Sequence, residues 1–455
     1  MDASEGLHGP GLRALVQALR DGGATAEDVT HACIDRTRAD EGRVRAWAWF
    51  DPARALALAR AADAARELGT ARGALHGVGV ALKDIIDAAG LPTGMGSPIF
   101  ARHVAARSAA VVERLVAAGA FVLGKTATCE FATQHPPATT NPWNPQFTPG
   151  GSSSGSAAAV AAGFAPVAIG SQTRGSTIRP AVFCGIVGMK PSFGRVSRFG
   201  MLETSFSLDH TGILARTFDD ACLVLSQIEG PDPRDRATLG RTWEGGGGAL
   251  APLAAPPRLA ALRTPAWDLA DVAQHELFEA NCEALRRVGA QIHHVELPAS
   301  FAAADAATRT LQLAELARNF FEINARSRDL MSDTFRALYD RGARVGATEY
   351  EDALGVQKTL TPALTAFLGG YDAVVTPPAA GEAPRLAHGT GDASFCVIWT
   401  LCGAPCVSFP TGLGPQGLPM GLQVVAAPGA DRRALEVAMW CSAQLRFSAR
   451  PPRAA

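Results

Sequence analysis

The sequence predicts an α/β fold with a largely parallel central sheet. Segments with helical periodicity alternate with short apolar segments that are rich in β-branched residues and bounded by glycine. Apolar residues make up 47% of the 455 residues, which supplies a large core, and charged residues make up only 19%. This combination is typical of helical layers packed on a buried sheet.

Residues 11–66 are predicted to be helical. The segment "LRALVQAL" carries apolar side chains at helical spacing. The segment "TAEDVTHACIDRT" begins at Thr25, a candidate N-cap, and has acidic residues in its first turn. The segment "ARALALARAADAAREL" consists largely of strong helix formers.

The pattern changes at Gly77. The segment "GVGVALKDII" (Gly77–Ile86) predicts a buried strand. The segment "SAAVVERLVAAGAFVLGKT" predicts a helix, a stop at Gly119 and a short strand. Farther along, Ser156–Ala162 should form a helix and "PVAIGSQT" a strand.

A segment rich in glycine and proline, Thr242–Pro257, either divides two domains or forms a surface loop within one large fold. Beyond it, "RLAALRT" predicts a strand, and helices are expected at about 271–288 and 303–345. Three further strands are expected near the C-terminus, in "YDAVVTPP", "APCVSFPTG" and "LPMGLQVVAAP".

Composition argues against several classes of partner and location. The net charge is −1, which favours neither nucleic acid nor an anionic membrane as a partner. The longest charge-free segment rich in alanine and glycine, Gly150–Thr173, is interrupted by Pro166 and predicts no membrane span. The N-terminus resembles no secretory signal, and the nine cysteines show no disulfide framework, so we expect a cytoplasmic protein with reduced thiols. Cys402 and Cys406 lack a second ligand pair, so we expect no zinc.

The stretch "PGGSSSGSAAAV" (Pro149–Val160) permits three interpretations. A flexible linker is disfavoured, because the serines precede a run of helix formers that they would cap. The sequence "GSSSG" also matches the nucleophile elbow G-x-S-x-G, with Ser153 as nucleophile, but that motif requires a strand before it. Three prolines in the last nine residues of "TTNPWNPQFTPG" argue against that strand. The third interpretation is a catalytic loop that acts together with other segments.

A second serine-containing turn supports the third interpretation. The segment "SQTRGSTIRPA" follows an apolar strand, and its small residues allow several backbone N–H groups to point at one place, as in an oxyanion hole. Ser176 lies 24 residues after Ser152, a length that suits one helix and one strand returning to the same edge. Lys83 ends another apolar strand, where a lysine is unusual unless it is paired or functional.

Taken together, these segments resemble the amidase signature family. The matching pieces are "ALHGVGVALKDIIDAAGLPTGMGS", "GKTATCEFA", "NPWNPQFTPGGSSSGSAAAVAAGFAPVAIGSQTRGSTIRPAVFCGIVGMKPSFGRVSRFG", "SFSLDHTGILARTFDDA", "WTLCGAPCVSFPTG" and "GLPMGLQVV". The resemblance implies a single large fold whose central mixed, mostly parallel sheet is covered by helices on both faces. Within it we expect an N-terminal helical region 1–70, a signature core 74–225, a surface loop 242–257 and a C-terminal half 258–455 that completes the sheet and the substrate pocket.

The resemblance also implies a Ser–cis-Ser–Lys triad. Ser176 would be the nucleophile, Ser152 the bridging serine after a cis peptide bond, and Lys83 the base, its pKa lowered by burial. The implied activity is hydrolysis of a small carboxamide to a carboxylate and ammonia or an amine, through an acyl-enzyme, with no metal or organic cofactor. The oxyanion would be held by the backbone N–H groups of Thr173, Arg174, Gly175 and Ser176.

The loop before the nucleophile departs from the commonest family pattern. Gln172-Thr-Arg-Gly-Ser stands where most members have Asp-Thr-Gly-Gly-Ser. Gln172 and the following "STIRPA" resemble malonamidase-like bacterial amidases, in which the arginine three residues after the nucleophile binds a substrate carboxylate. Arg179 occupies that position, and a guanidinium can hold a carboxylate bidentately. Arg174 and Ser153 are further candidate substrate contacts, although Arg174 either narrows the acyl pocket or projects into solvent.

Two other functions remain open. One is the A subunit of a tRNA-dependent amidotransferase, which would need a partner protein and deliver ammonia from glutamine; Gln172 and the divergent segment 258–370 count against it. The other is an inactive family member that serves as a binding module, against which the three retained triad residues count. The expected partner is a small-molecule amide, and a homodimer is possible by analogy with relatives.

Overall fold

The computed structural model describes residues 11–240 and 248–452, so the start of the predicted N-terminal region and residues 242–247 of the predicted surface loop lie outside the described residues. Eleven strands form one sheet in the order β1-β3-β2-β4-β6-β5-β10-β11-β9-β7-β8. The strands are β1 Trp47–Phe50, β2 Gly79–Lys83, β3 Phe121–Thr126, β4 Val167–Gln172, β5 Val187–Lys190, β6 His210–Ala215, β7 Arg258–Leu262, β8 Gln291–Val295, β9 Ala373–Thr376, β10 Cys406–Leu413 and β11 Pro419–Val425. Strands from both sides of the segment 242–257 therefore belong to the same sheet.

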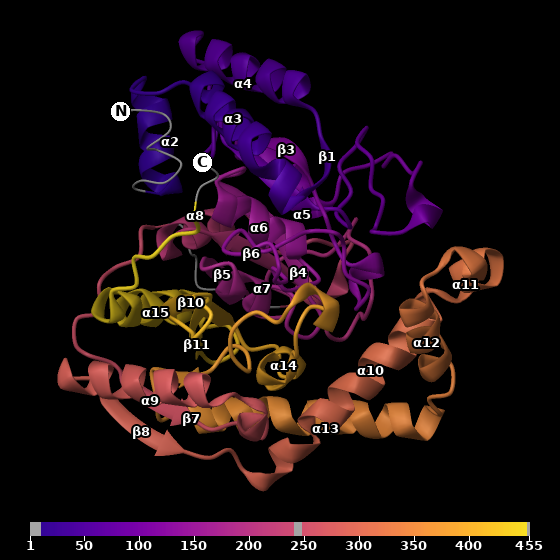
Figure 1. The fold of residues 1–455 in the computed structure, drawn as a ribbon, viewed down its shortest axis with the longest axis vertical. Helices are drawn as coiled ribbons and strands as arrows, with labels where there is room; N and C mark the ends of the chain where they lie inside the picture. Colours follow the sequence, from indigo (N-terminus) through magenta and orange to yellow (C-terminus); the bar gives the residue numbers. More distant parts are fainter. Residues whose placement is uncertain (1–10, 241–247, 453–455) are drawn as a thin grey trace.

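The described helices pack on this sheet and on one another. They are α2 Leu12–Asp21, α3 Ala26–Val44, α4 Pro52–Glu67, α5 Ala110–Ala117, α6 Ser154–Ala162, α7 Ile178–Phe183, α8 Phe218–Ile228, α9 Val272–Arg287, α10 Ala304–Asn319, α11 Phe321–Ser327, α12 Asp333–Gly342, α13 Ala347–Leu368, α14 Ser394–Leu401 and α15 Asp431–Leu445. Helices α5, α8, α15 and α9 contact one another in that order, and each also contacts the sheet. Helices α6 and α7 contact each other and the central strands, and α10 and α13 contact each other at one end of the molecule (Figure 1).

The sheet is mixed, as predicted, but the parallel majority is wrong. Among the described strands, six of the ten pairings are antiparallel and four are parallel. The parallel pairings form two blocks, with β2 between β3 and β4, and β7 between β8 and β9. Between the blocks, β10 and β11 are joined by only five residues, a connection that is far too short for a parallel crossover.

The predicted helical region 11–66 contains a strand that the helical pattern concealed. Helix α3 ends at Val44 because Arg45 adopts the left-handed conformation, with φ of 54°. The next residues form β1, which pairs antiparallel with β3. The carboxylate of Glu41 accepts hydrogen bonds from the backbone N–H groups of Ala46 and Trp47, which fixes the turn into this strand.

Most other predicted elements are present with shifted ends. Thr25 caps α3 by accepting a hydrogen bond from the N–H of Asp28. The predicted helix at 303–345 is divided into α10, α11 and α12, and Ser332 caps the last of these. Helix α6 begins at Ser154, two residues before the predicted start.

Three strand glycines let the segments around α6 and α7 approach the sheet closely. A Cβ at Gly170 would lie 2.7 Å from Ser153 Oγ, and one at Gly212 would lie 2.0 Å from Thr177 Oγ1. A Cβ at Gly188 would likewise lie 2.4 Å from the Cβ of Ala181 in α7. These contacts seat the two serine-containing segments directly against β4, β5 and β6.

Candidate active site

Lys83 is the last residue of β2, and its side chain is fully buried. Its Nζ donates hydrogen bonds to Ser152 Oγ at 2.7 Å and to Ser171 Oγ at 2.8 Å. Strand β2 is parallel to its neighbour β4, which carries Ser171 and leads directly into the loop of Ser176. The carboxyl ends of parallel strands lie at the same edge of a sheet, so the lysine and the second serine turn emerge side by side.

The pKa of Lys83 is lowered to about 7, chiefly because burial disfavours the charged ammonium. Negative charge on Cys129 and Asp209 would act in the opposite direction. A lysine with this pKa is neutral in a substantial fraction of molecules at neutral pH, and a neutral amine next to a hydroxyl can accept its proton.

The loop that carries Ser152 has the predicted backbone. The peptide bond between Gly151 and Ser152 is cis. The carbonyl oxygen of Ser152 accepts hydrogen bonds from Thr128 Oγ1 at 3.1 Å and from the N–H of Cys129 at 3.3 Å. Ser154 Oγ closes the turn by donating to the carbonyl oxygen of Gly150. The Ser152 hydroxyl is thereby held against Lys83.

Ser153 does not line the cavity described below. Its side chain is fully buried, donates to the carbonyl oxygen of Ser171 and accepts from the N–H of the same residue. This placement favours a structural role for Ser153, joining α6 to β4, over the predicted substrate contact.

The loop between β4 and α7 is held by the side chain of Gln172. Its Oε1 accepts hydrogen bonds from the N–H groups of Thr177 and Ile178, at 2.9 and 3.1 Å, and so caps α7. Its Nε2 donates to Thr400 Oγ1, which in turn donates to the carbonyl oxygen of Arg174. Within the described residues, the backbone N–H groups of residues 174–176 donate to no other group, which leaves them available to an oxyanion.

Asp209 supports the same loop. Thr173 Oγ1 donates to Asp209 Oδ1 at 2.6 Å, and the N–H groups of Thr204 and Ser205 donate to Oδ2 at 2.8 and 2.9 Å. Burial raises the pKa of Asp209 to about 6, although these hydrogen bonds oppose the shift. Asp209 is not among the site residues predicted from the sequence, because no motif distinguishes it from the other aspartates.

Ser176 lies in the wall of a cavity of about 420 Å³. Thr173, Arg174, Gly175 and Arg179 line the same cavity. The remaining walls come from distant segments, namely residues 132–134, Pro136, residues 386–393, Gln312 of α10 and Thr334 of α12. The nucleophile candidate, the oxyanion-hole candidates and two arginines therefore face one space.

Arg179 is buried beneath this cavity. Its Nη2 donates to the carbonyl oxygen of Gly151 at 2.7 Å and to Thr390 Oγ1 at 3.4 Å. Its Nε and Nη1 are buried and have no hydrogen-bond partner among the described residues. A buried guanidinium with unused donors is well suited to an incoming carboxylate.

Arg174 forms part of the cavity wall, which decides between its two predicted placements. Its Nη2 is paired with Asp305 Oδ1 of α10 at 2.6 Å, and its side chain is only 15% exposed. Arg309 contacts the other oxygen of Asp305 at 2.8 Å. The pair fixes the loop to α10, a contact that no local pattern in the sequence indicated.

Two kinds of feature are absent from the described part of the chain. No group of three or more His, Cys, Asp and Glu side chains is arranged to hold a metal ion in residues 11–240 and 248–452. In the same residues, no helix has the length and apolar character to cross a membrane.

Comparisons with known proteins show which family and which fold the chain resembles. A family model described as Amidase matches residues 28–435. The A subunit of glutamyl-tRNA(Gln) amidotransferase from Anaeromyxobacter sp. (strain K) is 36% identical over 460 residues, which cover 92% of each chain. The corresponding protein of Chloroflexus aurantiacus (strain ATCC 29366 / DSM 635 / J-10-fl) is 47% identical over 235 residues, and here the match spans about half of each chain, 50% and 48%. The solved peptide amidase from Stenotrophomonas maltophilia has a TM-score of 0.84 and 30% identity, covering 97% of this chain and 98% of that one.

These matches confirm some of the predictions made from the sequence and leave others untested. They confirm the amidase signature family and the α/β fold. The curated relatives favour the amidotransferase alternative over a free-standing small-molecule amidase. The malonamidase-like subgroup stays a prediction.

Proposed function

The chain belongs to the amidase signature family, and on that premise we propose that it cleaves the C–N bond of a carboxamide through an acyl-enzyme on Ser176. The observation that carries the proposal is the contact of the buried Lys83 amine with Ser152 Oγ at 2.7 Å. A buried lysine is costly, and a serine hydroxyl alone does not offset that cost. A neutral lysine beside a serine, at the edge that carries Ser176, is the arrangement that a proton relay requires.

The relay runs from the nucleophile to the lysine. Neutral Lys83 accepts the proton of Ser152 while its own N–H donates to Ser171, and Ser152 accepts the proton of Ser176. Ser176 Oγ then attacks the amide carbon, and the carbonyl oxygen becomes an oxyanion held by the N–H groups of the 173–176 loop. Ser152 returns the proton to the departing nitrogen, ammonia or an amine leaves, and water releases the carboxylate through the same relay in reverse.

We infer that the substrate carries a carboxylate near its amide. Arg179 offers buried, unused N–H donors in the wall that contains Ser176. A bidentate contact would satisfy these donors and fix the amide carbon in front of the nucleophile. Small amides of dicarboxylic acids and glutamine both fit this description.

A second candidate function is ammonia delivery from glutamine to a partner protein. The amidotransferase relatives favour it, at 36% identity over nearly the full chain. Asp392 adds an observation from the cavity, because its carboxylate lines the same wall. Burial alone would raise its pKa, but hydrogen bonds from Ser394 and the charges of Arg179 and Arg174 lower it, so it would pair with the ammonium group of an amino-acid amide.

One experiment separates the two candidates. Ammonia release is measured at pH 8 with malonamate, succinamate, glutamine and propionamide, with wild type and Ser176→Ala side by side. A free-standing amidase acts on malonamate or succinamate without a partner and loses this activity in the variant. If glutamine is the only one of these amides that releases ammonia, the amidotransferase function is favoured. If none of them releases ammonia and no fluorophosphonate adduct forms on Ser176, both proposed functions are contradicted.

A further inference from the structure

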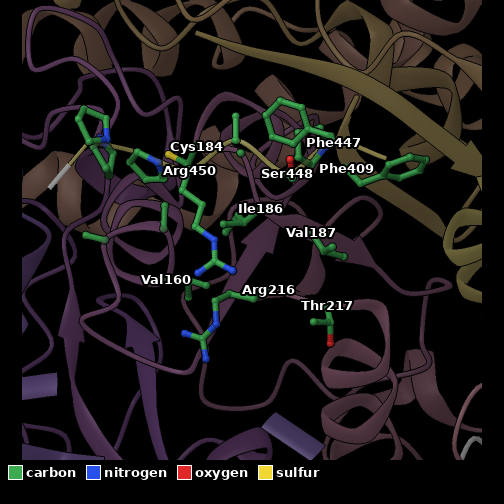
Figure 2. Close-up of a pocket in the computed structure, with 18 of the residues that line it drawn as sticks. Val160, Cys184, Ile186, Val187, Arg216, Thr217, Phe409, Phe447, Ser448 and Arg450 are labelled. Carbon is green, nitrogen blue, oxygen red and sulfur yellow. The ribbon is translucent and has the colours of Figure 1, made fainter. Parts of the chain in front are cut away.

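A second cavity, of about 380 Å³, lies away from the triad at the other end of α6. Helix α6 begins beside Ser152, and its last residues, Val160 to Ala162, line this cavity. The helix is about 13 Å long, and the linings of the two cavities share no residue, so the cavities are separate spaces. Figure 2 shows this second cavity, with side chains from the central strands and from the C-terminal segment around it.

Arg216 is the unusual residue in its wall. It follows β6 directly, and its Nε, Nη1 and Nη2 are all buried without a hydrogen-bond partner among the described residues. Arg450 approaches from the C-terminal segment, and Figure 2 shows both guanidinium groups in the same space. Their charges repel, and this repulsion adds to burial in lowering the pKa of Arg216. A buried cation without a partner is costly, and a second cation nearby increases the cost.

The carboxylates near this cavity are already engaged or do not reach Arg216. Both oxygens of Asp40 accept hydrogen bonds from Arg43 at 2.9 Å, and Arg36 lies 3.7 Å from one of them. Asp220 acts on Arg216 through its charge, but its Oδ1 accepts the N–H of Leu12 at 2.6 Å, and its Oδ2 bonds to no described residue. The cavity lining therefore contains four arginines but only one acidic residue, Asp40, and that residue is already hydrogen-bonded to Arg43.

Much of the remaining wall is apolar and includes three phenylalanine rings, Phe218, Phe409 and Phe447. Ile186, Val187, Phe409 and Phe447 line the cavity together with the arginines. Its volume lies within the range of about 300–1,000 Å³ that is common for small-molecule sites. An anion with an apolar body could pair with the arginines and pack against the apolar side chains at the same time.

We propose that this cavity binds a small aromatic carboxylate, with its carboxylate on Arg216 and its ring against Phe409 and Phe447. Arg216 supplies two parallel N–H donors, the geometry that a carboxylate accepts. The bound ion would neutralise the repulsion between Arg216 and Arg450. This site is independent of the chemistry at Ser176 and would exist in either of the functions proposed above.

Benzoate is the probe, and the full chain carrying Ser176→Ala is the protein. Calorimetric titration should show binding of benzoate, and the melting temperature should rise with benzoate concentration. Arg216→Gln should weaken this binding about tenfold or more, whereas Arg179→Gln, which alters the catalytic cavity, should leave it intact. Benzyl alcohol, which lacks the carboxylate, should not bind.

The guanidinium nitrogens of Arg216 are buried, so a second pair of variants keeps the test decisive if Arg216→Gln does not fold. Arg450→Gln and Phe447→Ala alter the more exposed C-terminal segment, and each should weaken benzoate binding. The proposal is overturned if benzoate does not bind at millimolar concentration, or if binding is lost in Arg179→Gln and kept in the other variants. Inorganic phosphate binding without benzoate binding would overturn it too, since the site would then hold a simple anion.

Discussion

Arg179 Nη2 donates a hydrogen bond of 2.7 Å to the carbonyl oxygen of Gly151. This contact ties the helix that follows Ser176 to the peptide that precedes Ser152. One guanidinium therefore joins the two serine-containing segments and still has two nitrogens without a hydrogen-bond partner among the described residues. In the function proposed above, one side chain would therefore both position the nucleophile and bind the substrate.

The relay predicts that Lys83→Met loses almost all activity. Methionine has a similar length but cannot accept a proton, and loss of a general base typically costs about 10²–10⁴-fold in rate. The measurement is kcat/KM for ammonia release. Ser152→Ala should fall comparably, and adding Lys83→Met to Ser152→Ala should cost little more, since the two residues act as one unit. If the double variant lost activity by the product of the two single losses, this result would contradict the relay.

Activity should rise with pH through the pKa of Lys83. The folded-state pKa is lowered to about 7, and the base works only when neutral. The logarithm of kcat/KM should therefore increase with pH below about 7 and reach a plateau above it, with the acid limb set by Lys83. A profile that still rises steeply between about pH 8 and 10 would show a lysine with an ordinary pKa and would contradict the burial argument.

Asp209→Asn should lower kcat more than it changes KM. The carboxylate accepts three hydrogen bonds, one of them from Thr173 in the oxyanion loop, and an amide cannot accept all three. Displacement of this loop can cost up to roughly 10²-fold in rate. Thr173→Ser retains the hydroxyl and is the matched control, expected near wild type. Equal, small effects of both substitutions would assign Asp209 a role in stability alone.

Arg179→Lys should reduce the preference for amides that carry a carboxylate. Lysine keeps the charge but loses the planar pair of donors, and a hydrogen bond to a charged group contributes about 1.5–3 kcal/mol. The measured quantity is the ratio of kcat/KM for succinamate to that for propionamide, expected to fall by about tenfold or more. A merely structural Arg179 would lower both values equally and leave the ratio unchanged.

Arg174→Gly should admit bulkier acyl groups. Arg174 fills part of the cavity wall and is held there by Asp305. Its removal should raise kcat/KM for a bulky amide relative to a small one by about tenfold, the scale of pocket discrimination. Asp305→Asn keeps the arginine and breaks only its charge pairing, so its effect should be smaller. If Arg174→Gly leaves the ratio of kcat/KM for the bulky and the small amide unchanged, the acyl group of the substrate does not lie beside Arg174.

The local elements of the catalytic core could be predicted because short-range patterns determine them. Lys83 ends a run of buried β-branched and apolar residues, and the structure places it at the end of β2. The serine cluster leads into helix formers, and α6 begins at Ser154. The resemblance to the amidase signature family implied which serines act together, and the cis bond that it implied between Gly151 and Ser152 is present.

The remaining features depend on contacts across long stretches of chain. Asp305 lies 131 residues from Arg174, and Thr400 lies 228 residues from Gln172, so no periodicity connects them. Pairing direction in the sheet is also a tertiary property, because an apolar strand has the same pattern in either direction. The cavity at Arg216 could not be predicted for the same reason, since its walls come from segments spread between Arg36 and Pro452.

The most direct test of the central claim is the site of covalent attack. The chain is treated with a fluorophosphonate, and the adduct is located by peptide mass spectrometry in wild type, Ser176→Ala and Lys83→Met. The relay predicts one adduct on Ser176, none in Ser176→Ala and much slower formation in Lys83→Met. An adduct on Ser152 or Ser153 in wild type, or equal rates in wild type and Lys83→Met, would contradict it.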